Sequence, residues 1–282
     1  MQLPVQLLRR KSDTHKGDYG HLLIIGGSPG LTGAVCLAAQ AALRIGAGLV
    51  TVGIPESLNL IFEIKLTEVM SLLLSETSSH AISFKSFNKI KEFTTRVDAL
   101  VIGVGAAKAP STKRLILKVI EEIDKPKVVD ADGINALAGD LKVLEKRLND
   151  LVLTPHLGEF SRLIKRDIDF IRSNRKHLAK EFALRYNLIL VLKGSRTLVT
   201  DGHRLFENTT GNPGMATAGM GDVLTGIIGG LVVQGLNLFE AAKIGVYLHG
   251  LAGDCAAKEK TQLSLIASHV IEYLPRAIKE SS

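Results

Sequence analysis

The sequence predicts a three-layer α/β/α fold with a mostly parallel central sheet, formed by residues 1–282 as a single domain. Short apolar segments alternate with longer helical patterns along most of the chain. These apolar segments show little polar alternation, which is typical of strands buried on both faces of a parallel sheet. Gly, Pro or Asp borders the segments, so their lengths suit strands better than buried helices.

The expected strands cover residues 22–25, 49–54, 99–102, 126–129, 151–153, 188–192, 197–200 and 204–206. The Asp201-Gly202 pair between the last two predicts a hairpin, because this dipeptide readily adopts the turn that joins antiparallel strands. Helical patterns over residues 34–45, 222–233, 238–257 and 264–279 are expected to supply outer layers. We find no internal repeat, linker or low-complexity tract in the sequence.

The composition indicates a cytoplasmic protein with a large core and no membrane association. Apolar residues make up 46% of the chain. The longest uncharged apolar run, residues 223–233, is shorter than the roughly 20 residues that cross a bilayer. No signal-peptide pattern is present at the N-terminus. Cys36 and Cys255 stand alone, without a CxxC or Cys/His cluster, so neither a disulfide nor a metal site is expected.

The formal net charge of +7 does not by itself indicate a nucleic-acid partner. The basic residues are scattered and often neighbour acids, there is no Trp, and aromatic residues make up only 5%. We therefore expect no nucleic-acid binding. The charge is interpreted as a solvated basic surface or as a field that gathers small anions.

The strongest local signal is a glycine-rich segment, residues 211–222, that runs directly into a helical pattern. Gly219 and Gly221 let the backbone approach a ligand closely, and the amides at the start of the helix offer an anion site. One interpretation is that Asp222 is no more than the N-cap of the helix, a role that Asp fills well. The preceding Asn212-Pro213-Gly214 favours a second interpretation, in which amides stabilise phosphate charge while the carboxylate takes a hydroxyl proton.

Other strand ends carry weaker signals. Lys193 follows an expected strand directly and could reach phosphate oxygens, although no stretch fits the P-loop pattern. The first turn, residues 26–33, lacks the glycine spacing of a dinucleotide fingerprint and contains Pro29, which disfavours a Rossmann dehydrogenase. Asp132 could cap a helix or help to hold Mg²⁺ indirectly. His156 should lie at the carboxyl edge of the sheet, with a structural or a ligand-binding role.

Several segments occur in an order that resembles one known family. They are Lys16-Gly17-Asp18-Tyr19-Gly20-His21, Thr32-Gly33-Ala34, Arg44-Ile45-Gly46-Ala47-Gly48, Gly103-Val104-Gly105, Asp130-Ala131-Asp132-Gly133-Ile134-Asn135, Thr154-Pro155-His156-Leu157-Gly158-Glu159-Phe160, Lys193-Gly194 and the run from Asn212 to Asp222. Over about residues 14–276 the chain resembles the ADP-dependent NAD(P)H-hydrate dehydratases, a branch of the ribokinase-like superfamily. Many members have Gly-Pro-Gly where this chain has Val104 between its glycines. Many are also fused to an epimerase domain, so the chain resembles a stand-alone form.

The resemblance implies a ribokinase-like fold and a repair reaction. The hydroxyl at C6 of (S)-NAD(P)H hydrate would be phosphorylated, and loss of phosphate would restore NAD(P)H. Asp222 would be the catalytic base and, with Ala34, Gly105 and His156, would bind the hydrate. The nucleotide would be held by Lys193, Gly194, Ser195, Arg196, Thr197, Asn212, Gly219, Met220 and Gly221. ADP is the expected co-substrate, with Mg²⁺ but no metal ligand assigned among the residues.

The partners expected from the resemblance are the two hydrates NADHX and NADPHX, ADP, and a separate NAD(P)H-hydrate epimerase. A homo-oligomer is also expected, with a tetramer as the working assumption. Two alternatives remain open at this point. One is an ATP-dependent kinase that phosphorylates the hydroxyl of a small molecule. The other is a nucleotide-binding regulator without turnover, which the Asp222 carboxylate at an anion site disfavours.

Overall fold

In the computed structural model, which describes residues 1–10 and 12–282, nine strands form one sheet in the order β3-β2-β1-β4-β5-β6-β7-β8-β9. The strands are β1 His21–Ile25, β2 Leu49–Pro55, β3 Met70–Leu74, β4 Ala99–Ile102, β5 Lys127–Val129, β6 Leu151–Leu153, β7 Ile189–Leu192, β8 Leu198–Thr200 and β9 Leu205–Glu207. Strands β1 to β7 run parallel, whereas β8 pairs antiparallel with β7, and β9 with β8.

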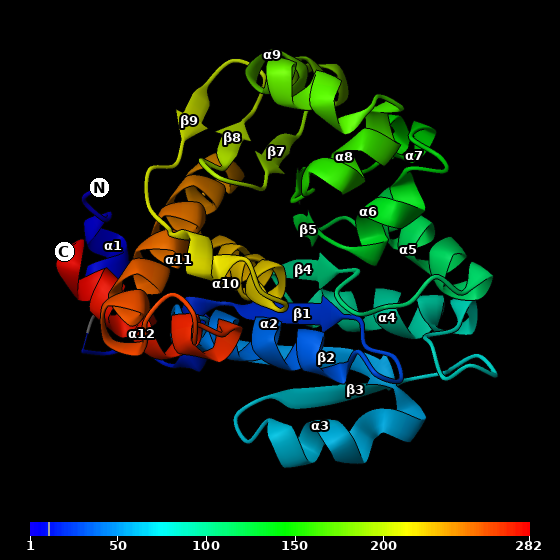
Figure 1. The fold of residues 1–282 in the computed structure, drawn as a ribbon. Helices are drawn as coiled ribbons and strands as arrows, with labels where there is room; N and C mark the ends of the chain where they lie inside the picture. The colour runs from blue at the N-terminus through cyan, green and yellow to red at the C-terminus, as the bar shows by residue number, and fades with distance from the viewer. Residues whose placement is uncertain (11) are drawn as a thin grey trace.

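Helices cover both faces of this sheet (Figure 1). They are α1 Val5–Leu8, α2 Thr32–Arg44, α3 Asn59–Lys65, α4 Phe87–Phe93, α5 Pro110–Glu122, α6 Asp132–Leu137, α7 Lys142–Lys146, α8 Leu157–Ile164, α9 Ile168–Tyr186, α10 Met220–Val233, α11 Leu238–Lys260 and α12 Ala267–Glu280. Leu22 and Ile24 of β1 join a core with α2, α10, α11 and α12. Leu23 and Ile25 of β1 join a second core with α4 to α9. The predicted three-layer, mostly parallel α/β architecture is therefore confirmed.

The hairpin predicted at Asp201-Gly202 joins β8 to β9. The carboxylate of Asp201 accepts hydrogen bonds from the backbone N–H groups of His203 (2.9 Å) and Arg204 (2.7 Å). Gly202 has a φ of +96°, which favours glycine at this position. Strand β3 was not among the expected strands. It lies at the sheet edge, and its residues from Met70 to Leu73 are exposed or half-buried, so it lacks the buried apolar pattern of the inner strands.

Helix α10 packs closely against α2. A Cβ atom at Gly226 would lie 2.1 Å from the carbonyl oxygen of Ala38, a distance that no side chain tolerates. Facing residues of α2, including Ala38 and Ala42, are fully buried. The glycine pattern of this apolar helix therefore serves close helix packing. Within the described residues, no helix is both long and apolar enough to span a bilayer.

Candidate active site

The carboxyl ends of β1, β4, β5, β6 and β7 meet at one edge of the sheet, because these neighbouring strands are parallel. The segments that leave them are hydrogen-bonded to one another. The backbone N–H of Gly27, after β1, donates to the carbonyl of Val104, after β4 (3.1 Å). The backbone N–H of Lys193, after β7, donates to the carbonyl of Pro155, after β6 (2.8 Å). The edge is therefore a continuous surface of turns, where open α/β folds bind ligands.

The turn after β4 brings Gly105 against the start of α2. Gly105 has a φ of +59°, and a Cβ atom there would lie 3.2 Å from the Cβ of Ala34. The Ser28 hydroxyl donates to the carbonyl oxygen of Gly105 (2.9 Å). Val104 is fully buried, so packing fixes this turn with valine where the resemblance led us to expect proline. Ala34 and Gly105, both predicted to line the hydrate site, thus lie together.

Asp222 lies in the first turn of α10. The N-cap of this helix is Gly219, which has a left-handed φ of +87°, and no side chain caps the helix. The interpretation of Asp222 as an N-cap is therefore wrong. Among the described residues, none hydrogen-bonds to or forms an ion pair with the Asp222 carboxylate, which leaves its oxygens available to a ligand.

A buried ion pair lies beside Asp222. The ammonium of Lys193 is 2.6 Å from Oδ1 of Asp130, and the Thr225 hydroxyl donates to Oδ2 of the same carboxylate (2.8 Å). A Cβ atom at Gly221 would lie 3.2 Å from Nζ of Lys193. The ammonium therefore sits against the residue that precedes Asp222. In this structure the ammonium is directed to Asp130, and the phosphate contact predicted for Lys193 stays a prediction.

Three carboxyl groups and one ammonium share this region, and burial and neighbouring charges shift the pKa values of Asp222, Glu159 and Lys193. Burial, followed by repulsion from Asp130, raises the pKa of Asp222 to about 7. Burial also raises the pKa of Glu159 to about 7, against the opposing charge of Lys193. Burial alone would lower the pKa of Lys193, but the carboxylates of Asp130 and Glu159 raise it above its ordinary value. A carboxyl that titrates near neutral pH is suited to proton transfer.

His156 is the N-cap of α8, a role that sequence reasoning left open. Its Nδ1 accepts hydrogen bonds from the backbone N–H groups of Gly158 (3.0 Å) and Glu159 (3.2 Å). The Glu159 carboxylate in turn accepts from the backbone N–H of His156 (2.8 Å), which completes a capping box. Burial, then the charges of Lys193 and Arg162, lowers the pKa of His156, which favours the neutral ring, and Nε2 lies 3.5 Å from Oε1 of Glu159. The side chain is 55% exposed, which allows it to contact a ligand as well.

The two segments predicted to hold the nucleotide have defined conformations. The guanidinium of Arg175 donates to the carbonyl oxygens of Ser195 (2.8 Å) and Arg196 (3.1 Å), while the Thr197 hydroxyl donates to the carbonyl of Gly194 (3.0 Å). In the second segment, the side-chain oxygen of Asn212 accepts from the backbone N–H of Gly214 (3.1 Å). This second segment continues through Gly219, Met220 and Gly221 into α10, where it meets Lys193.

No group of three or more His, Cys, Asp or Glu side chains in the described part of the chain could by itself hold a metal ion. Asp132 is the first residue of α6, and its carboxylate accepts from the side-chain amide of Asn135 (3.1 Å). It makes no side-chain cap, so the capping alternative for Asp132 is wrong. Its indirect role at Mg²⁺ stays a prediction.

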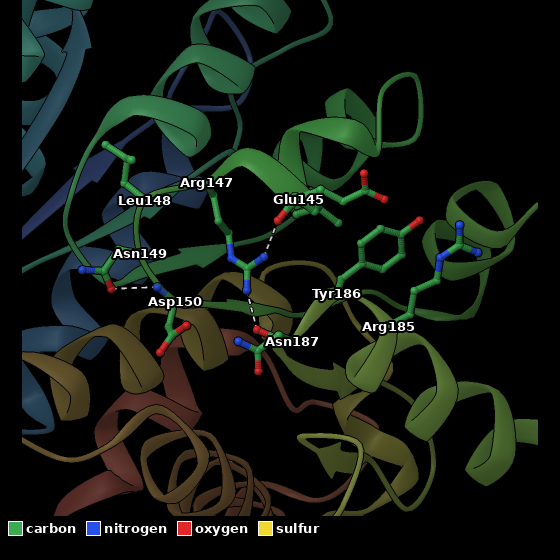
Figure 2. Close-up of a pocket in the computed structure, with 9 residues that line it drawn as sticks. Glu145, Arg147, Leu148, Asn149, Asp150, Arg185, Tyr186 and Asn187 are labelled. Carbon is green, nitrogen blue, oxygen red and sulfur yellow. Dashed lines mark hydrogen bonds between the residues drawn. The ribbon is translucent and has the colours of Figure 1, made fainter.

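Two pockets are lined by other residues, and the second borders the nucleotide segment because Arg175, one of its lining residues, bonds the carbonyls of Ser195 and Arg196. Figure 2 shows a pocket of about 400 Å³ around Arg147, whose guanidinium donates to the carbonyl oxygens of Leu144 and Asn187. Asp150, which lines it, directly precedes β6, so this pocket lies at the amino end of the strands. A second pocket, of about 420 Å³, lies between α9 and the β8–β9 hairpin. Neither contains a residue predicted for the active site.

Sequence reasoning did not assign four side chains that shape this site: Asp130, Glu159, Thr225 and Asp254. Asp130 and Glu159 carry a signal that could have been used, since each is an acid within a few residues of a buried strand end. Thr225 lies one turn after Asp222 on the same helix, the spacing that places two side chains on one face. For Asp254, which contacts residues more than 40 positions away, no local pattern offers a signal.

A family model described as NAD(P)H-hydrate dehydratase matches residues 22–276. A Moorella thermoacetica protein, the bifunctional NAD(P)H-hydrate repair enzyme Nnr, is 46% identical over 276 residues, which cover 97% of this chain and 52% of that protein. The chain thus spans about half the length of the curated relatives it matches.

Two solved structures are similar over nearly the whole chain. The ADP/ATP-dependent NAD(P)H-hydrate dehydratase of Bacillus subtilis, co-crystallised with ATP and Mg²⁺, has a TM-score of 0.83 and 28% identity, covering 100% of this chain and 95% of that one. A ribokinase-like superfamily protein of Enterococcus faecalis has a TM-score of 0.83 and 27% identity, covering 97% of this chain and 92% of that one.

Proposed function

Because the chain belongs to the NAD(P)H-hydrate dehydratase family, we propose that it restores NAD(P)H from (S)-NAD(P)H hydrate in an ADP-dependent reaction. This activity makes it a carbon–oxygen lyase. The observation that carries the proposal most directly is Asp222, an unpaired carboxylate in the first turn of α10 whose pKa is raised to about 7. This placement combines a proton acceptor with helix N-terminal amides that favour phosphate.

The proposed reaction has two steps, phosphorylation of the C6 hydroxyl and loss of phosphate. The Asp222 carboxylate would accept the proton of the C6 hydroxyl while that oxygen bonds to the terminal phosphorus of ADP, with AMP as the leaving group. The C6–O bond then breaks, phosphate departs with the bonding electrons, and the neighbouring ring carbon loses a proton to form the double bond of NAD(P)H. The amides from Gly219 to Asp222 and the positive end of α10 would stabilise the phosphate charge.

The residues also fit the use of Mg²⁺ with the nucleotide, which the Bacillus subtilis neighbour's ATP and Mg²⁺ support. Mg²⁺ commonly binds phosphates plus one or two carboxylates and keeps several waters. Asp130 is engaged by Lys193 and Thr225, and Glu159 by the backbone of His156, so Asp222 is the carboxyl group of this cluster available to the ion or its waters. Bound there, the ion would neutralise phosphate charge.

The decisive experiment measures return of the NADH absorbance band after hydrate is added, with ADP, with ATP and without nucleotide. Conversion that depends on ADP supports the proposal, and conversion only with ATP would correct the co-substrate. If the protein instead phosphorylates a stable alcohol and releases a phosphomonoester, the kinase alternative replaces it.

The curated relatives are described as bifunctional repair enzymes, which supports an NAD(P)H-hydrate epimerase as a functional partner. Such an activity would supply the S epimer that the dehydratase consumes. An assay on mixed epimers tests this: added epimerase should let conversion go to completion. The homo-oligomeric state also stays a prediction, which light scattering of the purified protein tests.

A further inference from the structure

The segment that runs from Thr210 to Met220 lies on helix α11. Asp254 of α11 anchors its beginning with both carboxylate oxygens. Oδ2 accepts from the backbone N–H of Gly211 (2.8 Å), and Oδ1 accepts from the side-chain amide of Asn212 (2.9 Å). Gly211 has a φ of +101°, a conformation that glycine reaches readily but that competes with many others when the residue is unrestrained. The Asp254 carboxylate therefore restrains both Gly211, a flexible residue, and Asn212, which is predicted to bind the nucleotide.

Small residues of α11 allow the segment to approach the helix. A Cβ atom at Gly250 would lie 2.3 Å from the hydroxyl of Thr210, and one at Gly253 would lie 2.3 Å from the sulfur of Met215. The Thr210 hydroxyl also donates to the carbonyl oxygen of Tyr247 on α11 (2.8 Å). These contacts fall on the same helix face as Asp254, since residues three and four apart in a helix are neighbours.

The far end of the segment is held by the same helix. The ring of His249 on α11 lies against the backbone of Met220, the first residue of α10, and burial lowers the pKa of His249 to about 4. Its ring is therefore neutral at physiological pH. Helix α11, which lies beside α10 in Figure 1, thus holds both ends of the segment that leads to Asp222.

We propose that Asp254 is a positioning residue for the nucleotide: it holds residues 211–214 in their binding conformation before the ligand arrives. The inference rests on the proposed function, because it takes this segment as part of the nucleotide site. Pre-formed binding segments avoid the entropic cost of ordering on binding, so loss of the anchor should weaken nucleotide affinity. Ala34, Gly105 and His156 are held by other elements, so hydrate affinity should change little.

The test compares Asp254→Ala and Asp254→Asn with wild-type protein in steady-state kinetics. Two charge-assisted hydrogen bonds are lost in the alanine variant, so the KM for ADP should rise about tenfold or more. The asparagine variant keeps one acceptor oxygen and the same shape, so its KM should lie between those of the alanine variant and the wild type. The KM for the hydrate should stay within about twofold in both. Glu259→Gln is the matched control, since Glu259 is an acid on the same helix whose partners among the described residues are Tyr273 and Arg276, and it should leave both KM values unchanged.

Nucleotide-induced shifts in melting temperature provide a second readout, each measured from the variant's own melting temperature. Asp254→Ala should show a smaller shift with ADP or ATP than wild type, even if its own stability is lower. Unchanged KM for ADP, or equal rises in both KM values, would overturn the inference and leave the proposed function intact. Wild-type protein that neither converts the hydrate nor is stabilised by nucleotide would instead refute the proposed function.

Discussion

Asp222→Asn should make the protein more stable and nearly inactive at pH 8. In the folded protein the pKa of Asp222 rises from 3.8 to about 7, chiefly through burial. The folded state therefore holds a proton that the unfolded chain has already lost between these two pH values, and stability falls as pH rises through this window. At 1.36 kcal/mol per pKa unit, the ionised carboxyl costs about 4 kcal/mol of folding free energy above pH 7.

The neutral amide of asparagine avoids most of this cost but must itself be desolvated, at about 1–3 kcal/mol. The net expectation is a gain of about 1–3 kcal/mol in the free energy of unfolding at pH 8. For a chain of this size that gain corresponds to roughly 2–10 °C in melting temperature. The gain should shrink as pH falls below about 7 and vanish between about pH 5 and pH 6, because each pH unit in this window returns about 1.4 kcal/mol to the wild-type protein. Below that range the variant should be the less stable of the two.

Urea denaturation of both proteins at pH 8 and pH 4.5 measures the difference, with Asp169→Asn as a control. The Asp169 side chain is 89% exposed, so its substitution should change stability by less than about 0.5 kcal/mol. Turnover of Asp222→Asn should fall about 100-fold or more, the effect of losing a general base. A variant less stable than wild type at pH 8 would refute the reasoning, since it would mean that the carboxylate supports the fold. Turnover within a few-fold of wild type would refute its catalytic role.

Three further outcomes follow from the site. Catalytic turnover should decline as pH falls below about 7, because protonated Asp222 cannot accept the hydroxyl proton; a rate independent of pH from 5 to 8 would contradict this. ADP or ATP with Mg²⁺ should raise the melting temperature, and Lys193→Ala should reduce this shift if the ammonium meets phosphate; the variant's own melting temperature should fall as well, since Asp130 loses its partner. His156→Ala should raise the KM for the hydrate but not for ADP, and the lost N-cap should cost about 0.5–2 kcal/mol in urea denaturation; parallel rises in both KM values would indicate a packing role only.

The fold was predictable where burial imposes a strong pattern. The inner strands are apolar on both faces, so segments such as 22–25 and 99–102 can be recognised as strands from the sequence alone. Strand β3 does not, because an edge strand is covered on fewer sides and its apolar residues carry no clear period. The sequence pattern predicted that α10 begins at Asp222, whereas it begins at Met220. Its start is set by the left-handed conformation of Gly219, which tertiary packing selects and which the local sequence does not specify.

Single residues of the candidate site were predictable from the sequence, but the contacts between them were not. The position of Lys193 at a strand end was read from local sequence, yet its partner Asp130 lies 63 residues away, directly after a different strand. Only the strand order, which places β5 two positions from β7, brings them together. His156 shows a second limit: its capping role depends on the exact start of α8, which a single sequence does not specify.

The contact between Gly226 and Ala38 has a consequence for how this enzyme can change during evolution or engineering. Gly226 lies one turn beyond Asp222 on α10, and any side chain at this position would push the helix away from α2. Because one helical turn moves as a unit, the displacement would reach Asp222, the proposed catalytic base. An alanine introduced to strengthen the helix would thus damage the chemistry through the backbone. A Cβ atom at Gly230 of the same helix would likewise lie 2.5 Å from the side chain of Ile45, so this face of α10 has no room for new side chains.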